Sequence, residues 1–370
     1  MPMPRSTDRK NGVVLLDTRQ NTPEHEHSVH LKLADGLARL LDTEVVDAAT
    51  SAQRDSLYYL PTETLIDPTR HAALGVRSIA DFFGGMVQHP YMATKAISHP
   101  LPAHAAFPLG WTDDFARQAS EALLRGYTVF SREDALRAGD LLLHDGPIRL
   151  KPVRATAGRG QTVLTDIHEL PALVDQLDRQ ELAVWGLVLE ENLDDVTTFS
   201  VGQALVAGIT CSYYGTQQLT QDHDGVSVYG GSDLVLVRGG YDALLQLALD
   251  EPQRLAITQA CTYEQAALAT LPGFIASRRN YDVACGVTYE GHRRSGVLEQ
   301  SWRIGGASSA ELLALQALAD DPALQRVCAS THEVFGEVDL PADATLFYQG
   351  DDREVGRISK YARIRTYDHP

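Results

Sequence analysis

"NYDVACGVTYEGHRRSGVLEQSWRIGGAS", residues 280–308, contains two runs of β-prone residues on either side of "TYEGHR". Glu290 and Gly291 favour a tight turn at that point, so the two runs are predicted to pair as an antiparallel hairpin. In a hairpin centred on this turn, Asp282 lies opposite Glu299. The segment therefore brings two carboxylates together on one sheet.

Two like charges directly across a strand ladder, with Cβ atoms about 5 Å apart, repel each other unless something neutral or positive lies between them. Ser301 and Arg303 follow Glu299 at alternate positions, so the same strand face also carries a hydroxyl and a guanidinium. Oxygen ligands of this sort suit Mg²⁺ that arrives with a triphosphate, and the arginine suits a carboxylate or a transferring phosphoryl group. The predicted metal ligands are Asp282, Glu299 and Ser301. The alternative is a solvated hairpin face with two acids and a neutralising arginine.

A second stretch, "RLKPVRATAGRGQTVL" at residues 149–164, places Lys151 at the end of an apolar run and just before a glycine-containing loop. It is neither GxxxxGK[ST] nor a GxGxxG that opens a helix. Gly158 and Gly160 allow backbone N–H groups to approach a phosphate, because glycine has no Cβ. We predict a flap that closes over a nucleotide while Lys151 meets a phosphate. A plain hairpin with a surface lysine is the alternative.

The composition limits the possible partners. The 370 residues carry 32 Lys and Arg against 49 Asp and Glu, a formal charge of −17, which repels nucleic acid and anionic lipid over most of the surface. The four cysteines show no metal-like spacing and are expected to be reduced thiols. Neither a signal peptide nor an apolar run long enough for a membrane helix is recognisable. We therefore expect a cytoplasmic protein with no nucleic-acid or membrane partner.

The order of predicted elements indicates an α/β protein with α+β lobes. A strand at 13–17, a helix with Thr22 as N-cap and a strand at 44–47 make a β-α-β unit at the N-terminus. Helices are predicted near 308–319 and 322–335. We divide the chain into an N-terminal α/β domain (1–108), a small lobe with the glycine flap (109–190) and a large lobe with the metal site (191–370).

This order of motifs resembles the ATP-grasp superfamily over about residues 110–308, with the β-α-β unit as the domain that precedes the ATP-grasp fold. The stretches "SYYGTQQLT", "VYGGSDL" and "LEQSWRIGGAS" resemble an uncharacterised bacterial subfamily, a numbered domain of unknown function. The resemblance implies a phosphate-binding role for Lys151 and a closing-loop role for Gly158 and Gly160. It implies that adenine is held at the crossover formed by Glu190, Glu191 and Leu193. It also implies Mg²⁺ on Asp282 and Glu299, and Arg303 on an acyl phosphate or its carboxylate precursor.

Three positions depart from the pattern of the superfamily. Ser301 stands where asparagine is usual, and Thr197 stands where a ribose-binding acid is common. The earlier phosphate-binding lysine is missing, which leaves Arg117 or the more distant Lys95 as candidates.

Two further groups of residues are candidates for the cleft. Of the neighbours Arg278 and Arg279, Arg279 is predicted to neutralise the triphosphate. The first β-α junction, with its histidines in "HEHSVH" (25–30), is predicted to face the cleft, because such junctions often do so in α/β sheets. The spacing of these histidines does not favour a metal site, because they do not share one face of a helix.

The predicted activity is an ATP- and Mg²⁺-dependent ligase that joins a small-molecule carboxylate to an amine or a thiol through an acyl phosphate. The alternatives are a small-molecule kinase and a catalytically degenerate nucleotide-binding or sensor protein. A homodimer is the family-level expectation. The sequence does not identify the acid or the nucleophile.

Overall fold

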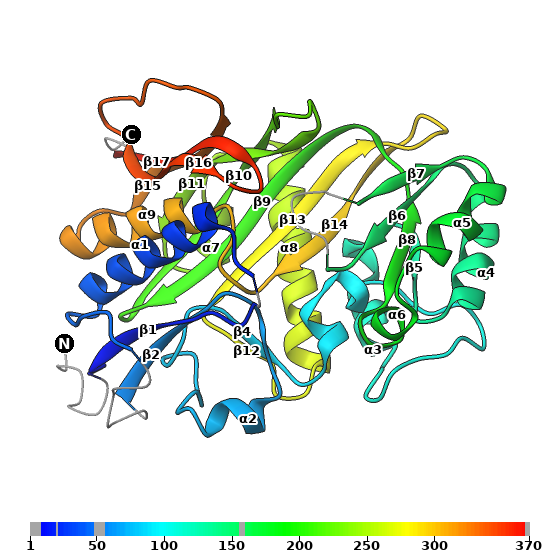
Figure 1. Cartoon of the computed structure of the whole chain (residues 1–370), viewed down its shortest axis with the longest axis horizontal. Coiled ribbons are helices and arrows are strands. Elements are labelled where there is room, and N and C mark those ends of the chain that lie inside the picture. The colour runs from blue at the N-terminus through cyan, green and yellow to red at the C-terminus, as the bar shows by residue number, and fades with distance from the viewer. Residues whose placement is uncertain (1–8, 20, 48–55, 155–159, 367–370) are drawn as a thin grey trace.

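The computed structural model describes residues 9–19, 21–47, 56–154 and 160–366. Within these residues the strands form an eight-stranded sheet, a four-stranded sheet and two small sheets of three and two strands (Figure 1). Among the described helices, none is both long and apolar enough to cross a membrane.

The eight-stranded sheet carries most of the residues of interest. Its strands are ordered β14-β13-β9-β10-β11-β15-β17-β16 and pair antiparallel. Their bounds are β9 (Asp194–Val206), β10 (Ile209–Gln221), β11 (Ser227–Arg238), β13 (Arg278–Val287), β14 (Arg293–Ser301), β15 (Arg326–Phe335), β16 (Thr345–Asp352) and β17 (Gly356–Thr366).

Helices cover both faces of this sheet. The long helix α8 (Glu251–Thr270) packs on one face, where its alanines share a core with Tyr281, Val283 and Val297. On the other face α1 (Glu24–Leu40) and α9 (Ser308–Asp320) lie side by side over Tyr213 and Val327 (Figure 1). A short helix, α7 (Tyr241–Leu245), packs against α8 and β10.

The four-stranded sheet forms a smaller lobe, with strand order β5-β8-β6-β7. It consists of β5 (Gly126–Val129), β6 (Ile148–Pro152), β7 (Thr162–Leu164) and β8 (Leu187–Glu191), covered by α4 (Arg132–Leu143), α5 (Leu170–Asp175) and α6 (Arg179–Trp185). Ser131 caps the N-terminus of α4, because its hydroxyl accepts a hydrogen bond from the Asp134 N–H at 3.1 Å. A separate apolar core fills this lobe.

The N-terminal β-α-β unit differs from the prediction in its second strand. β1 (Gly12–Leu16) pairs in parallel with β2 (Leu57–Pro61), whereas residues 44–47 contribute only one isolated bridge, between Val13 and Val45. The physical reason is burial: every residue of β2 is buried, but residues 44–47 are mostly exposed. The helix also begins one residue later than expected, after Pro23, with no side-chain cap.

Short elements connect this unit to the large sheet. β3 (Leu65–Ile66), β4 (Gly85–Val87) and β12 (Ile275–Ala276) form the three-stranded sheet, and α2 (Pro68–Ala72) follows β3. Two 3₁₀ turns, Pro90–Ala93 and Lys95–Ile97, then lead towards α3 (Asp114–Gln118).

The helix predicted at 322–335 is wrong, because residues 326–335 form strand β15. Val327, Ala329 and Thr331 are buried while their neighbours are more exposed, so the burial repeats every second residue. α9, by contrast, confirms the helix predicted at 308–319.

The predicted α/β fold class is confirmed. The lysine strand, the crossover strand and the two acidic strands occur in the order predicted for an ATP-grasp fold, on β6, β8, β13 and β14. The domain limits at 108 and 190 stay a prediction.

Candidate active site

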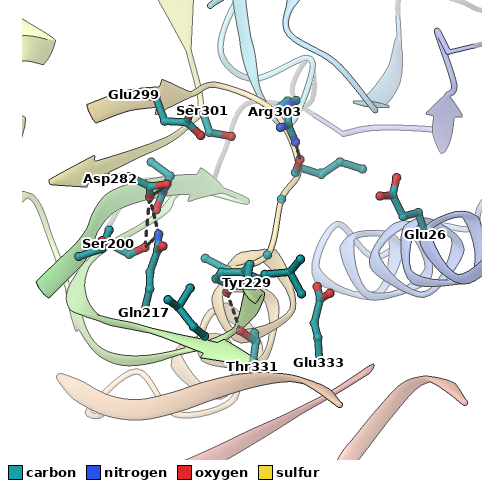
Figure 2. A pocket seen from close by; sticks show the side chains of 18 of the residues that line it. Glu26, Ser200, Gln217, Tyr229, Asp282, Glu299, Ser301, Arg303, Thr331 and Glu333 are labelled. Atoms are coloured by element: carbon teal, nitrogen blue, oxygen red, sulfur yellow. Dashed lines mark hydrogen bonds between the residues drawn. The ribbon is translucent and has the colours of Figure 1, made fainter. Parts of the chain in front are cut away.

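A pocket of about 810 Å³ lies between the small lobe, the α1 face of the large sheet and the first turns of α1 (Figure 2). Most of the residues predicted for the site line it: Lys151, Glu190, Glu191, Leu193, Asp282, Glu299, Ser301 and Arg303. The structure thus gathers side chains from four strands of two different sheets into one cavity.

Asp282 and Glu299 are Cα partners across β13 and β14, so the predicted pairing is confirmed. Burial, followed by the charge of Glu299, raises the pKa of Asp282 to about 6. Two amides also point at Asp282: Gln217 Nε2 donates to Oδ1 at 2.7 Å, and Asn280 Nδ2 donates to the same atom at 2.9 Å. Carboxylate oxygens are ligands that a hard divalent cation prefers, and the repulsion between the two acids favours such an ion between them.

Lys95 supplies a positive charge to this acidic pair. Its ammonium forms an ion pair with Glu299, and the lysine is only 4% exposed. The Thr94 hydroxyl, which accepts a hydrogen bond from the Ala96 N–H, caps the 3₁₀ turn that carries it. Burial opposes ionisation of Glu299, but the Lys95 charge holds the pKa of this carboxyl below its usual value. The other candidate, Arg117, is exposed and pairs with Asp114, whereas Lys95 contacts the acidic pair, although neither side chain is among those that line the pocket.

Lys151 is fully buried between the two lobes. Its ammonium donates to Glu190 Oε1 at 2.8 Å and to the Leu298 carbonyl of β14 at 3.0 Å. Burial lowers the pKa of Lys151, and the Glu190 charge partly offsets this effect. Burial would raise the pKa of Glu190, but Lys151 and His99 together lower it to about 2. His99 lies 3.2 Å from the second carboxylate oxygen of Glu190.

A β-bulge makes the Leu298 carbonyl available. Asp282 pairs with Glu299, but Val283 already pairs with Val297, so Leu298 is an extra residue in β14. Such a bulge leaves the extra residue outside the ladder. The freed carbonyl is the one that accepts from Lys151.

The crossover residues Glu191 and Leu193 lie at the edge of the same pocket. Glu191 accepts from the Arg125 N–H at 2.8 Å and pairs with Arg294 at 3.0 Å. Leu193 is buried. Of the predicted flap glycines, Gly160 has a left-handed φ of 69°, and Gly158 lies outside the described residues.

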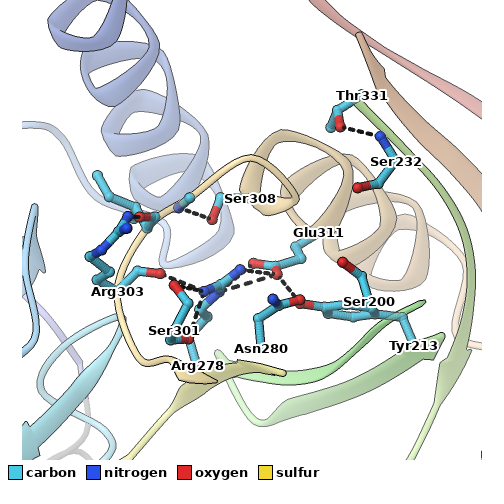
Figure 3. A network of polar contacts seen from close by, with 12 residues as sticks. Ser200, Tyr213, Ser232, Arg278, Asn280, Ser301, Arg303, Ser308, Glu311 and Thr331 are labelled. Atoms are coloured by element: carbon cyan, nitrogen blue, oxygen red, sulfur yellow. Dashed lines mark hydrogen bonds and ion pairs between the residues drawn. The ribbon is translucent and has the colours of Figure 1, made fainter. Parts of the chain in front are cut away.

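Ser301 contacts a buried arginine rather than an acid. Arg278 Nη1 lies 3.3 Å from the Ser301 hydroxyl, and the same guanidinium makes a bidentate pair with Glu311 of α9 (Figure 3). Arg278 and Glu311 are each 1% exposed. The Ser301 oxygen has a second lone pair that Arg278 does not use, and this lone pair could bind a metal ion. A metal role for Ser301 therefore stays a prediction.

The prediction for Arg279 does not agree with the structure. Arg279 pairs with Glu264 of α8 at 2.9 Å, on the other face of the sheet, and does not line the pocket. Arg278 lines it instead. Because successive residues of a strand point to opposite faces, one arginine had to face away, and the sequence did not show which.

Arg303 lies in the pocket without a direct acidic partner. Its Nη1 donates to the Ile304 carbonyl at 2.8 Å, and no carboxylate in the described ranges lies within ion-pair distance of it. Burial is the main cause of its lowered pKa, and although Glu299 acts in the opposite direction, the charge of Arg278 adds to the lowering. A buried guanidinium in this state favours an incoming anion.

The far end of the pocket contains charged residues that sequence reasoning did not assign: Arg19, Glu26, Glu333 and Lys360. His25 and His30 also line the pocket, which confirms that the first β-α junction faces the cleft; His27 does not line it. Glu333 was missed because its strand, β15, was predicted as a helix.

Comparison with solved structures finds partial likenesses. The ADP complex of N5-carboxyaminoimidazole ribonucleotide synthetase is 12% identical at a TM-score of 0.49, covering 97% of this chain and 93% of that one. A biotin carboxylase complex from Campylobacter jejuni is 10% identical at a TM-score of 0.49, covering 98% and 89%. Phosphoribosylamine–glycine ligase from Thermotoga maritima is 15% identical at a TM-score of 0.46, covering 96% and 92%.

None of the curated proteins compared with the chain matches it. A family model described as "Protein of unknown function (DUF3182)" matches residues 13–362. Because this match spans nearly the whole chain, the chain belongs to the DUF3182 family.

Proposed function

We propose that this chain is an ATP- and Mg²⁺-dependent ligase that joins a small-molecule carboxylate to an amine or a thiol. The observation that carries the proposal is the pairing of Asp282 with Glu299 in a pocket that also holds Lys151 and Arg303, with Lys95 in an ion pair with Glu299. Paired acids beside buried cations suit a triphosphate with its metal, and a further arginine suits the acid that receives the phosphoryl group.

The basic and the acidic residues of the site would bind different parts of Mg–ATP. Lys151, on β6, and Lys95, beside the acidic pair, would bind phosphate oxygens as point charges. Asp282 and Glu299 would hold Mg²⁺, which supplies charge neutralisation on the transferring phosphate. Glu190, Glu191 and Leu193 would border the adenine. Lys95 takes the place of the lysine that the superfamily pattern expects elsewhere.

The proposed reaction has two steps, both assisted by position and charge rather than by a covalent enzyme intermediate. A carboxylate oxygen of the substrate attacks the γ-phosphorus, the bond to the bridging oxygen breaks, and ADP leaves. The nucleophile then attacks the carbonyl carbon of the acyl phosphate, inorganic phosphate leaves, and the nucleophile loses its proton. Arg303 would bind the substrate carboxylate and then the acyl phosphate.

The test compares wild type with Lys151→Ala and Glu299→Ala. Pairs of acids and amines are screened for ATP-dependent release of inorganic phosphate, and the mass of each product is measured. We expect both variants to lose turnover while circular dichroism shows an intact fold. Turnover near the wild-type rate in both variants would end the proposal.

The same screen separates the other activity classes. ADP formation without inorganic phosphate, in the presence of a hydroxyl substrate, would indicate a kinase. Tight ATP binding with no turnover across the panel would indicate a nucleotide sensor. A cytoplasmic location and a homodimer are part of the proposal, and gel filtration with light scattering tests the second.

A further inference from the structure

We propose that the far end of the pocket binds the ammonium group of the acid substrate, so that this substrate is a zwitterion of the amino-acid type. The inference rests on the proposed function, because it assigns the substrate carboxylate to Arg303. It adds the chemistry of the opposite end of that substrate.

Two carboxylates of this far end come from different elements, Glu26 from α1 and Glu333 from β15 (Figure 2), and Glu354 is a further carboxylate in the pocket lining. Glu26 and Glu333 are each held by a cation through one oxygen: Arg19 Nη1 lies 2.5 Å from Glu26 Oε2, and Lys360 Nζ lies 3.0 Å from Glu333 Oε2. Within the described residues no donor reaches the other oxygen, Oε1, of either carboxylate. One acceptor atom on each acid is therefore available to a ligand.

His30 provides independent evidence of a ligand at this end. It shares a face of α1 with Glu26, four residues away, and lines the same pocket. The imidazole is 8% exposed, and its Nδ1 atom is buried with no hydrogen-bond partner among the described residues. Unsatisfied buried polar atoms are uncommon in native proteins, so this atom calls for a donor or an acceptor from outside the chain.

The charges along the pocket then match a zwitterion in one orientation. Arg303 follows the strand that carries Glu299, lines the same pocket and has no acidic ion-pair partner among the described residues, so it takes the substrate carboxylate. Glu26 and Glu333 carry free acceptor atoms at the far end, so they take an ammonium. Because Arg19 and Lys360 balance the charges of Glu26 and Glu333 one to one, a simple dication is less complementary to this pocket than a molecule with one group of each sign.

The experiment uses the full chain and a series of ω-amino acids from β-alanine to 6-aminohexanoate, together with the common L-amino acids. Each ω-amino acid is matched by the carboxylic acid and the amine of the same chain length. Binding is measured by calorimetry with and without Mg–ATP. At least one amino acid should bind about 10-fold or more tightly than its matched acid and amine, as expected for charge-assisted hydrogen bonds.

Glu26→Gln and Glu333→Gln should each weaken that binding about 10-fold and reduce the preference over the matched acid. Glu24→Gln, on an exposed position of the same helix, is the control and should leave it unchanged. Equal binding of the amino acids and their matched acids, no binding by any member of the series, or unchanged binding in both pocket variants would overturn the inference.

Separate measurements of nucleotide binding distinguish a failure of the proposed amino-acid subsite from a failure of the proposed ligase activity. Mg–ATP binding without preference for any amino acid would overturn the zwitterion subsite and leave the proposed ligase intact. Selective amino-acid binding without any Mg–ATP binding would overturn the ligase and support the subsite.

Discussion

The ammonium of Lys95 forms an ion pair with Glu299, whose Cα partner across the strand ladder is Asp282. Opposed carboxylates need a compensating positive charge, and the protein itself supplies part of it. Lys95 comes from a 3₁₀ turn almost two hundred residues before this hairpin in the chain. The relationship therefore makes one lysine both a structural counterion and a candidate phosphate ligand.

Lys95→Met tests this double role. The variant should bind Mg–ATP at least about 10-fold more weakly, since a charge-assisted contact to phosphate is lost. It should also lose about 1–3 kcal/mol of unfolding free energy, because the partly buried Glu299 loses its partner. Calorimetry and urea denaturation measure the two effects. Lys32→Met, at an exposed position of α1, is the control, and nucleotide affinity equal to wild type would contradict the assignment.

The two arginines predicted for catalysis should now behave differently. Arg303→Gln should reduce ATP turnover about 100-fold or more, because a guanidinium aimed at the reacting groups is lost. Arg279→Gln should keep turnover near the wild-type rate and mainly reduce stability, because Arg279 pairs with Glu264 away from the pocket. Steady-state kinetics on one preparation of each variant measures the contrast. A comparable loss of turnover in both variants would show that Arg279 does contribute to the site.

The pair formed by Arg278 and Glu311 should be important for stability. Glu311→Gln leaves a buried guanidinium without a counter-charge and should cost about 3–5 kcal/mol of unfolding free energy. Replacing both partners, as Arg278→Met with Glu311→Leu, should recover part of that loss, because neither apolar side chain leaves a charge unpaired. Guanidinium denaturation at neutral pH checks both values. A loss below about 1 kcal/mol in Glu311→Gln would contradict the estimate.

His30 predicts a pH effect on stability. Burial is the main cause that lowers its pKa to about 4, so between pH 4 and its usual 6.5 the unfolded chain binds a proton that the folded chain does not. Its contribution to stability is therefore complete above pH 6.5 and is lost as the pH falls through this window. His30→Gln should remove a change in unfolding free energy of about 3 kcal/mol across the window.

Urea denaturation at several pH values from 4 to 7.5 measures this change. His27→Gln, on a more exposed position of the same helix, controls for replacing a histidine in α1. An identical pH profile for His30→Gln and wild type would exclude the explanation.

The acidic hairpin could be predicted because its information is local. A turn, two β-prone runs and a period of two are enough to place Asp282 opposite Glu299. Lys151 was likewise found at a strand end, whereas the crossover acids followed from the resemblance to the ATP-grasp superfamily. The order of these strands in the chain then indicated the fold.

Lys95 was harder to assign because its segment has no periodicity. Glycines and prolines interrupt residues 82–102, and the turn reaches the site through the pairing of β4 with the distant β12. The sequence does not single out Glu333, because the helix predicted near 322–335 is strand β15, in which small and β-branched residues alternate. In both cases the position of the residue depends on tertiary contacts, which the local sequence does not show.

Leu298, the extra residue in β14, could be deleted without changing the pairing of the two acids. Without Leu298 the ladder would become regular, and Asp282 would still face Glu299, because the residues on either side already pair in that register. What would disappear is the second acceptor of Lys151, and with it a direct tether between the two lobes. Deletion of this one leucine would therefore keep the acidic pair but remove a hydrogen bond that connects the two lobes.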